Sequence, residues 1–293
     1  MKKRVIGIVN FSTLCKKNSG SFISSREKDW SEHQEQILSD ERLALRTKLF
    51  TEISLPLFDL QSRTPRNGNF QLVVLISSLL PSKYKTILMA AASIRPWLQI
   101  EERGIDDWLD APGAIKRALK RMNMEDFQDN CIFSSFRIDD DDFVSTQYLE
   151  NLEKYITTEH KGKFITFSLG YKCVWNRGKI TNLAPIHKPL IAIGLAHIGC
   201  YNASSDQFTT EPQTVFAGMN HFDLKKSHGV IEDSGKYMFM WSQHPHQDTI
   251  GRFKSVELED CWSEIPADII GSVLEFPSII GNIDVIDAKT LQE

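Results

Sequence analysis

The chain has 293 residues, of which 41% are hydrophobic and 25% are charged, and its formal net charge is −4. These values are typical of a globular protein with a full core, and they exclude a dedicated nucleic-acid-binding protein, which would carry a concentrated basic face. The longest apolar stretches, 72–80 and 189–201, are too short or too interrupted to span a membrane, and the N-terminus lacks a secretory apolar core. We therefore expect a cytoplasmic protein with no nucleic-acid partner and no transmembrane segment, able to reach the inner face of the cell membrane to meet a substrate.

Residues 1–142 alternate between strand-like and helix-like segments. Short β-branched and apolar runs predict strands at 4–12, 70–77, 97–100 and 131–137. Apolar residues at helical spacing predict helices over 30–61, 83–92 and 112–124, with a break or restart at Pro56. Such alternation is typical of a parallel sheet covered by helices, so this half is predicted to bind a nucleotide.

Residues 143–293 are less regular and richer in short strand-like runs. After a helix predicted over 146–156, strands are expected at 164–167, 171–175, 191–198, 214–216 and 237–241, and a last helix at 267–274. The whole chain is therefore predicted to form one α/β domain, in which residues 143–293 complete the site of residues 1–142. The five cysteines lie far apart without a CxxC pair, which predicts reduced thiols rather than a disulfide or zinc site.

Four consecutive carboxylates, Asp139–Asp142, directly follow the strand predicted at 131–137. Open α/β sheets bind their ligands at the carboxyl ends of their strands, and carboxylates this close need a cation if they are buried together. Oxygen donors at adjacent and i,i+2 positions suit Mg²⁺ or Mn²⁺. The alternative is a solvated acidic turn that caps the following helix. The position after a strand, with Arg137 in front, favours the metal site.

The order Arg–apolar–Asp–x–Asp–Asp over residues 137–142 is similar to the metal-binding DxD element of GT-A glycosyltransferases. It more specifically resembles the bacterial putative rhamnosyltransferase family. Residues 46–61, 69–84 and 168–171 match further parts of that family's pattern in the same order. The resemblance covers about residues 1–250. The chain departs from it at Asn10-Phe11, where the family often has Arg-Phe after the first strand.

The resemblance implies a GT-A-like (Rossmann-like) fold, with a mostly parallel sheet flanked by helices and a more irregular, β-richer C-terminal half. It also implies a metal-dependent transferase that moves a sugar, rhamnose by the family's name, from a nucleotide-sugar to a saccharide or lipid-linked saccharide acceptor in polysaccharide biosynthesis, with inversion. Mn²⁺ or Mg²⁺ would bridge the two phosphates of the donor. The residues expected to contact donor or ion are Asn10, Ser77, Arg137 and Asp139.

Within the acidic cluster, the resemblance makes Asp139 and Asp141 the metal pair, with Asp141 the more direct ligand. Asp142 is expected to support the site or position the sugar, and Asp140 to point away. Arg137 would offset the carboxylate charge or bind a phosphate through two of its guanidinium nitrogens. An ordinary ion pair with a carboxylate accounts for Arg137 equally well.

Six of the eight histidines follow residue 180, and His244, His246 and Asp248 share one loop. An inverting transferase needs a base for the acceptor hydroxyl, and His246 or Asp248 is the predicted base. His244 is predicted as a third metal ligand or, equally, as a base. These residues also fit a polar surface loop, in which case the base is sought at His221 or Glu211.

Two other function classes fit parts of the chain. His244, His246 and Asp248 resemble the HxHxD element of zinc hydrolases, but Thr249 stands where that family has His, and no histidine follows His246. A transferase-like scaffold without activity is the second alternative.

The aromatic residues Tyr171, Trp175 and Trp241 fit a sugar-stacking role, although such residues more often belong to a core.

Overall fold

The protein is described from a computed structural model. It covers residues 3–16, 29–63, 65, 68–107, 110–122, 130–176, 179–212, 224–247 and 274–280. The predicted segments 214–216 and 267–273, Cys261, His221 and Asp248 lie outside the described residues.

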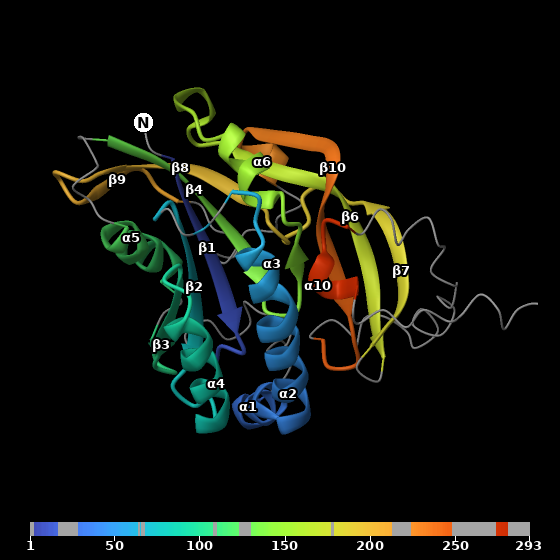
Figure 1. The fold of residues 1–293 in the computed structure, drawn as a ribbon. Coiled ribbons are helices and arrows are strands. Elements are labelled where there is room, and N and C mark those ends of the chain that lie inside the picture. The colour runs from blue at the N-terminus through green and yellow to red at the C-terminus, as the bar shows by residue number, and fades with distance from the viewer. Residues whose placement is uncertain are drawn as a thin grey trace, which may run out of the picture.

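Within that part of the chain, ten strands form one sheet in the order β3-β2-β1-β4-β8-β6-β10-β5, with β7 paired to β6 and β9 to β8. Their bounds are β1 Arg4–Phe11, β2 Phe70–Ser77, β3 Leu98–Arg103, β4 Asn130–Asp139, β5 Phe143–Val144, β6 Phe164–Asn176, β7 Lys179–His187, β8 Ala196–Asn202, β9 Gln207–Thr210 and β10 Val230–Gln243. β1–β4, β6, β9 and β10 run in one direction, and β5, β7 and β8 run against them. The sheet curls across the molecule (Figure 1).

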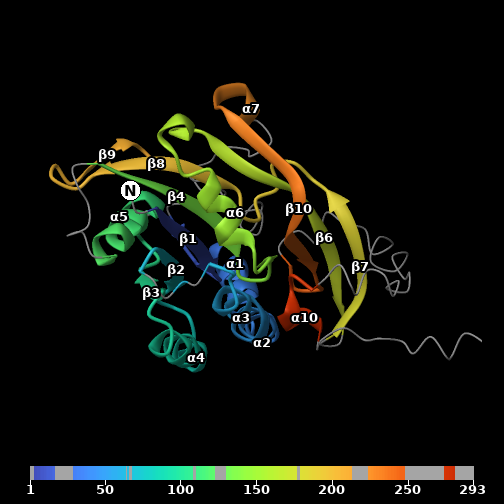
Figure 2. The same ribbon diagram turned by 45° about the horizontal axis from the view of Figure 1, so that its top comes forward.

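Helices cover both faces of the parallel half of the sheet. Their bounds are α1 Trp30–Leu38, α2 Asp40–Leu49, the π-helix η3 Phe50–Ser54, α3 Leu55–Asp59, α4 Ser82–Ser93, α5 Ala111–Arg121, α6 Tyr148–Lys154, the 3₁₀ turn η6 Thr158–His160, α7 Leu224–Ser227 and α10 Pro277–Ile280. Figure 2 shows α5 apart from the helices α2, α3 and α4. The predicted α/β class, with a mostly unidirectional sheet flanked by helices, is confirmed.

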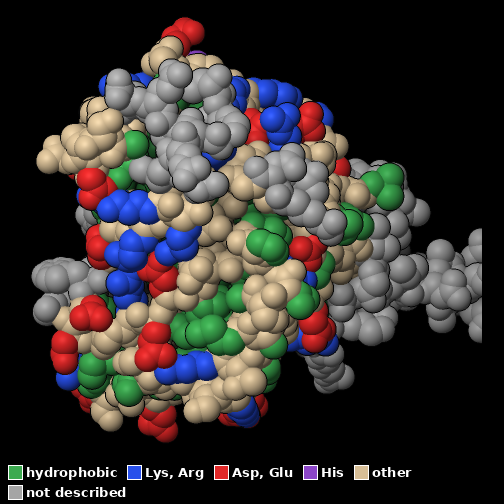
Figure 3. All heavy atoms as spheres, turned by 60° about the vertical axis from the view of Figure 1, so that its left-hand side comes forward, with side chains coloured by type: hydrophobic (Ala, Val, Ile, Leu, Met, Phe, Trp, Pro, Cys, Tyr) green, Lys and Arg blue, Asp and Glu red, His purple; other side chains and the backbone are tan. Residues whose placement is uncertain are grey.

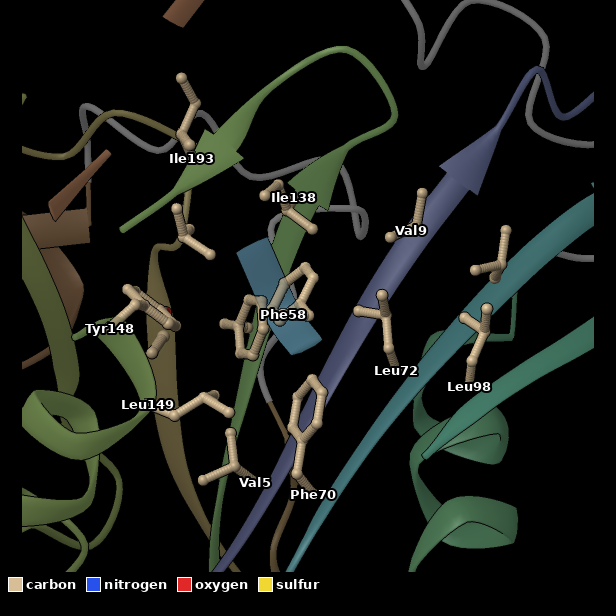
Figure 4. Packing of buried hydrophobic residues seen from close by; sticks show 14 of the residues in the cluster. Val5, Val9, Phe58, Phe70, Leu72, Leu98, Ile138, Tyr148, Leu149 and Ile193 are labelled. Carbon is tan, nitrogen blue, oxygen red and sulfur yellow. The ribbon is translucent and has the colours of Figure 1, made fainter. Parts of the chain in front are cut away.

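Successive side chains of the parallel strands point to alternate faces of the sheet, and this gives the core of the parallel half two layers. Phe70, Leu72 and Val74 of β2 pack in one cluster with residues of α2, α3, α4 and α6, whereas Val73 and Leu75 pack with α5. Successive side chains of a strand point to opposite faces, so a strand that is apolar at every position must be covered on both. Figure 4 shows the first layer, where the Phe58 and Phe70 rings stack at a centroid distance of 5.4 Å.

The predicted break at Pro56 takes the form of a π-helical segment. Helical structure runs from Asp40 through η3 to Asp59, and the N–H of Leu55 bonds back to the carbonyl of Phe50, five residues earlier. Proline has no N–H and clashes with the carbonyl four residues before it in an α-helix. The wider π turn directly before Pro56 accommodates this defect, so the helix continues.

Three predictions for the second half need correction. The strands expected at 164–167 and 171–175 are one strand, β6, and only the end of the predicted strand 191–198 lies in β8. β6 continues through Gly170, which lies against β10: a Cβ there would approach the carbonyl oxygen of Phe239 to 2.5 Å. Glycine permits this close approach, at a point where the β6–β10 register shifts.

The edge strand β3 carries charged side chains. Glu101 pairs with Arg103, Arg117 and Arg121, of which the last two belong to α5. Figure 3 shows the face with α4 and α5, where acidic and basic side chains lie side by side. Charges on an edge strand oppose pairing with a strand of another molecule.

Candidate active site

A cavity of about 150 Å³ lies at the carboxyl ends of β1 and β4. These strands are parallel neighbours, and the register pairs Asn10 with Asp139. The cavity is lined by Asn10, Ser12, Thr13, Ile37, Arg42, Arg46, Arg137, Asp139, Asp140, Asp141, Asp142, Trp241, Ser242 and Gln247. All four carboxylates of the acidic cluster thus face one cavity, together with three arginines.

Asp140 is the most deeply buried of the four carboxylates, with no exposed surface. Its Oδ1 pairs with the guanidinium of Arg46, itself buried on α2, and its Oδ2 has no hydrogen-bond partner among the described residues. Burial raises the pKa of Asp140 to about 7, against the opposing charge of Arg46. The expectation that Asp140 points away from the site is therefore wrong: it lines the cavity beside Arg46.

Asp141 joins the two halves of the chain. Its Oδ2 lies 2.9 Å from a guanidinium nitrogen of Arg46 and 2.9 Å from Nε2 of His244, which is 103 residues away in sequence. Burial acts to raise the pKa of Asp141, but the charge of Arg46 and the His244 hydrogen bond outweigh it and lower the pKa. Asp141 is therefore ionised, although it is buried.

His244 is fully buried and uses both ring nitrogens. Its Nδ1 accepts a hydrogen bond from the backbone N–H of His246 at 3.2 Å. An acceptor nitrogen carries no proton, so the neutral ring donates from Nε2 to Asp141. Asp141 and His244 thus contact each other directly, although His244 does not itself line the cavity.

Asp139 and Asp142, the first and last carboxylates of the cluster, have other partners. The guanidinium of Arg137 donates to Asp139 from two nitrogens, at 3.0 and 2.7 Å, so the two residues form a forked ion pair. Asp142 accepts the backbone N–H of Ser242 on β10 at 3.1 Å. Burial and the charges of Asp141 and Asp139 raise the pKa of Asp142 well above its ordinary value. In sequence, the ionised Asp141 therefore stands between Asp140 and Asp142, whose pKa values are both raised.

Asn10 and Ser77, both predicted to contact the donor, differ in position. Asn10 lines the cavity, and neither its Oδ1 nor its Nδ2 has a hydrogen-bond partner within the described residues. A buried amide without partners is costly unless a ligand satisfies it. Ser77 is not among the cavity-lining residues, and its hydroxyl accepts the N–H of Leu79 at 3.1 Å in the turn after β2.

A divalent ion is chemically compatible with these side chains, since the carboxylates of Asp139 and Asp141 share one cavity with a free oxygen of Asp140. The described residues contain no group of three or more acidic, His or Cys side chains already arranged around one point. Arg46 and Arg137 instead hold the carboxylate oxygens. Binding an ion would therefore require at least Asp139 to exchange its arginine partner for the metal.

The remaining histidines lie at other positions. His246 is half-buried and outside the cavity lining, and Asp248 lies beyond the described residues. His197 is buried on β8, where burial lowers its pKa to about 4, so it is neutral. His187 is exposed at the end of β7 and pairs with Glu232.

Arg42 and Arg46 have no assigned role in the sequence-based predictions. Arg42 donates to the hydroxyl of Ser12 at 2.8 Å and to the carbonyl of Ile37, and Arg46 holds Asp140 and Asp141. They lie four residues apart on the face of α2 that also carries the buried Leu43. Two charged residues at helical spacing among buried apolar ones are the signal that could have revealed them.

A family model described as putative rhamnosyl transferase matches residues 4–254. The chain belongs to this family. Its membership confirms the resemblance indicated by residues 137–142. No curated protein gives a significant match.

Solved structures give a weaker likeness. Residues 1–349 of TarS from S. aureus match with 12% identity and a TM-score of 0.33, covering 83% of this chain and 60% of that chain. A longer TarS chain has 13% identity and a TM-score of 0.32, covering 94% of this chain and 43% of that chain. A 4-diphosphocytidyl-2C-methyl-D-erythritol synthase has 8% identity and a TM-score of 0.34, covering 80% and 91%. This family member thus spans 60% or less of the TarS chains.

None of the described helices is both long enough and apolar enough to cross a membrane.

Proposed function

We propose that the protein transfers a sugar, rhamnose by the family's description, from a nucleotide-sugar to a hydroxyl of a saccharide or lipid-linked saccharide, with inversion. We place the reaction in the cytoplasm, at the inner face of the cell membrane where the acceptor is lipid-linked. Mn²⁺ or Mg²⁺ is the proposed cofactor, with Asp139, Asp141 and His244 as its ligands.

The observation that carries this proposal is the contact between Asp141 and His244. Two residues predicted separately as metal ligands, from opposite halves of the chain, lie side by side at an acidic cavity. An ionised carboxylate next to an imidazole is a donor pair that divalent metals accept once the imidazole nitrogen that faces the carboxylate has released its proton. The ion, when bound, would supply positive charge to the leaving diphosphate.

The chain's own residues contribute binding and charge. Asn10 and Ser12, at the end of β1, offer hydrogen-bonding groups toward the donor. Arg42 and Arg46 bring positive charge to the same cavity, which favours the phosphates of the donor and the negative charge that grows on the leaving diphosphate. Buried contacts with Ser12 and with the carboxylates hold Arg42 and Arg46 in place.

In the transfer step, the acceptor oxygen forms a bond to the anomeric carbon as the bond from that carbon to the phosphate oxygen breaks. The hydroxyl proton moves to a base, for which we propose His246 or Asp248, and the nucleoside diphosphate leaves with the bonding electrons. Attack opposite the leaving group inverts the configuration.

A thermal-shift assay tests the proposal. UDP, GDP, CDP or dTDP with Mn²⁺ should raise the unfolding temperature. At a ligand concentration 100 times the dissociation constant, the free energy of unfolding should increase by about 3 kcal/mol. A zinc hydrolase would respond to Zn²⁺ alone, and an inactive scaffold to none of these. A screen for nucleotide-sugar hydrolysis, with and without Mn²⁺, then identifies the donor. No shift with any nucleotide would overturn the proposed function.

Substitutions in the loop after β10 separate a base from a metal ligand. If His246 or Asp248 takes the acceptor proton, its replacement by Ala should lower transfer by about 10²-fold or more and leave binding of nucleotide with Mn²⁺ unchanged. His244→Ala should weaken metal and nucleotide binding together. Calorimetry beside an activity assay measures both quantities. Intact transfer in all three variants would exclude this loop and direct the search to His221 or Glu211.

A further inference from the structure

Two lysines lie over the ring of Trp241, which lines the cavity from β10. The ammonium nitrogen of Lys188, which directly follows β7, is 4.0 Å from the centroid of the Trp241 ring, and that of Lys172 is 5.9 Å away. Lys172 is the register partner of Trp241 on the neighbouring strand β6. We call Lys172, Lys188 and Trp241 the lysine–tryptophan cluster.

The two ammonium groups contact the indole ring and form no ion pair with a carboxylate of the described residues. None of the ion pairs among the described residues includes either lysine, whereas Arg46 and Arg137 of the cavity are paired with aspartates. Both lysines are half-buried. Burial and the nearby charge of Lys172 lower the pKa of Lys188, against the opposite effect of Asp142. Two partly desolvated like charges repel each other, and an anion between them would relieve this.

Trp241 is the member of the cluster that lines the cavity, and it comes from a different element than the groups assigned to the donor. Asn10 and Ser12 come from the end of β1, and Arg42 and Arg46 from α2. Trp241 belongs to β10, which is separated from β1 in the sheet by β4, β8 and β6. The next residue, Ser242, holds Asp142 through its backbone N–H. An acceptor approaching the cavity from β6 and β10 would meet Trp241 in the cavity wall and the two ammonium groups over its ring.

We propose that the lysine–tryptophan cluster is an acceptor subsite for a saccharide that carries a negative charge, either a phosphate or a carboxylate. Lys172 and Lys188 bind the anion, and Trp241 positions the two ammonium groups through cation–π contacts. This inference rests on the proposed function, because it assigns the acceptor side of the same cavity.

The test uses three small probes of the same sugar: glucose 1-phosphate, glucuronic acid and glucose. Each is titrated while the indole N–H signal of Trp241 is followed by NMR, after its assignment with Trp241→Phe. Titrations are run without nucleotide and with saturating nucleoside diphosphate and Mn²⁺, which fill the donor side. The variant is Lys172→Gln with Lys188→Gln. Lys116→Gln with Lys120→Gln is the control, since it removes the same charge from α5, where both lysines pair with Asp206.

In the wild type and the control, a charged probe should bind about 10-fold or more tightly than glucose, a ratio typical of one charge-assisted hydrogen bond. In the Lys172→Gln, Lys188→Gln variant, this advantage should fall to about two-fold or less, and it should shrink in the wild type as salt is added. The tighter of the two charged probes identifies the anion as a phosphate or a carboxylate.

Equal binding of all three probes to the wild type would overturn the inference. Loss of nucleotide affinity in the lysine variant would overturn it too, because the lysines would then serve the donor. Failure of the proposed function itself has a different signature: the wild type would bind no nucleoside diphosphate, while the titrations without nucleotide would still measure the preference for a charged sugar.

Discussion

Replacement of Asp141 by Asn is expected to lower turnover by about 10²-fold or more, whereas Asp140→Asn lowers it far less. Asp141 is the carboxylate whose pKa is lowered, so it is ionised and in contact with both Arg46 and His244. Asn removes that charge, and with it the support for charge that develops on the leaving diphosphate. Asp140 has a pKa near 7, so a neutral Asn resembles a form that it already adopts.

Steady-state transfer or nucleotide-sugar hydrolysis measures this difference, and circular dichroism confirms that both variants remain folded. Excess EDTA should abolish the activity of the wild type. Equal losses in the two variants would show that the roles within the acidic cluster are assigned wrongly. Full activity in EDTA would remove the metal from the proposed mechanism.

Arg46→Ala should lower the free energy of unfolding by about 3–5 kcal/mol. Arg46 is 5% exposed and is the shared partner of Asp140 and Asp141, so its loss leaves two buried carboxyls without their cation. Urea unfolding followed by circular dichroism measures the change.

Arg117→Ala is the matched control. Arg117 is 40% exposed, and its partner Glu101 keeps Arg103 and Arg121, so the expected loss is about 1 kcal/mol or less. A loss in Arg46→Ala no larger than that in Arg117→Ala would show that Arg46 is not needed to compensate the buried carboxylates.

Local sequence patterns were sufficient for much of the parallel half. The strand at 70–77 was predicted with the bounds that β2 has, and the acidic cluster was placed at the end of a strand, as it is at the end of β4. Both features can be recognised from residues adjacent in sequence. A continuous apolar run predicts a strand that is covered on both faces, and a run of adjacent carboxylates marks where such a strand ends. The same information failed for β6, because Gly170 interrupts the pattern while pairing with β10 continues through it.

The sequence by itself determined the α/β class, the strand that carries Asp139–Asp142, and, through residues 137–142, the family. Only the tertiary structure decided which partners these carboxylates have. Arg46 reaches Asp140 across 94 residues, and His244 reaches Asp141 across 103. Contacts over such separations depend on strand order and on the register between strands, and the periodicity of a single segment carries no information about either.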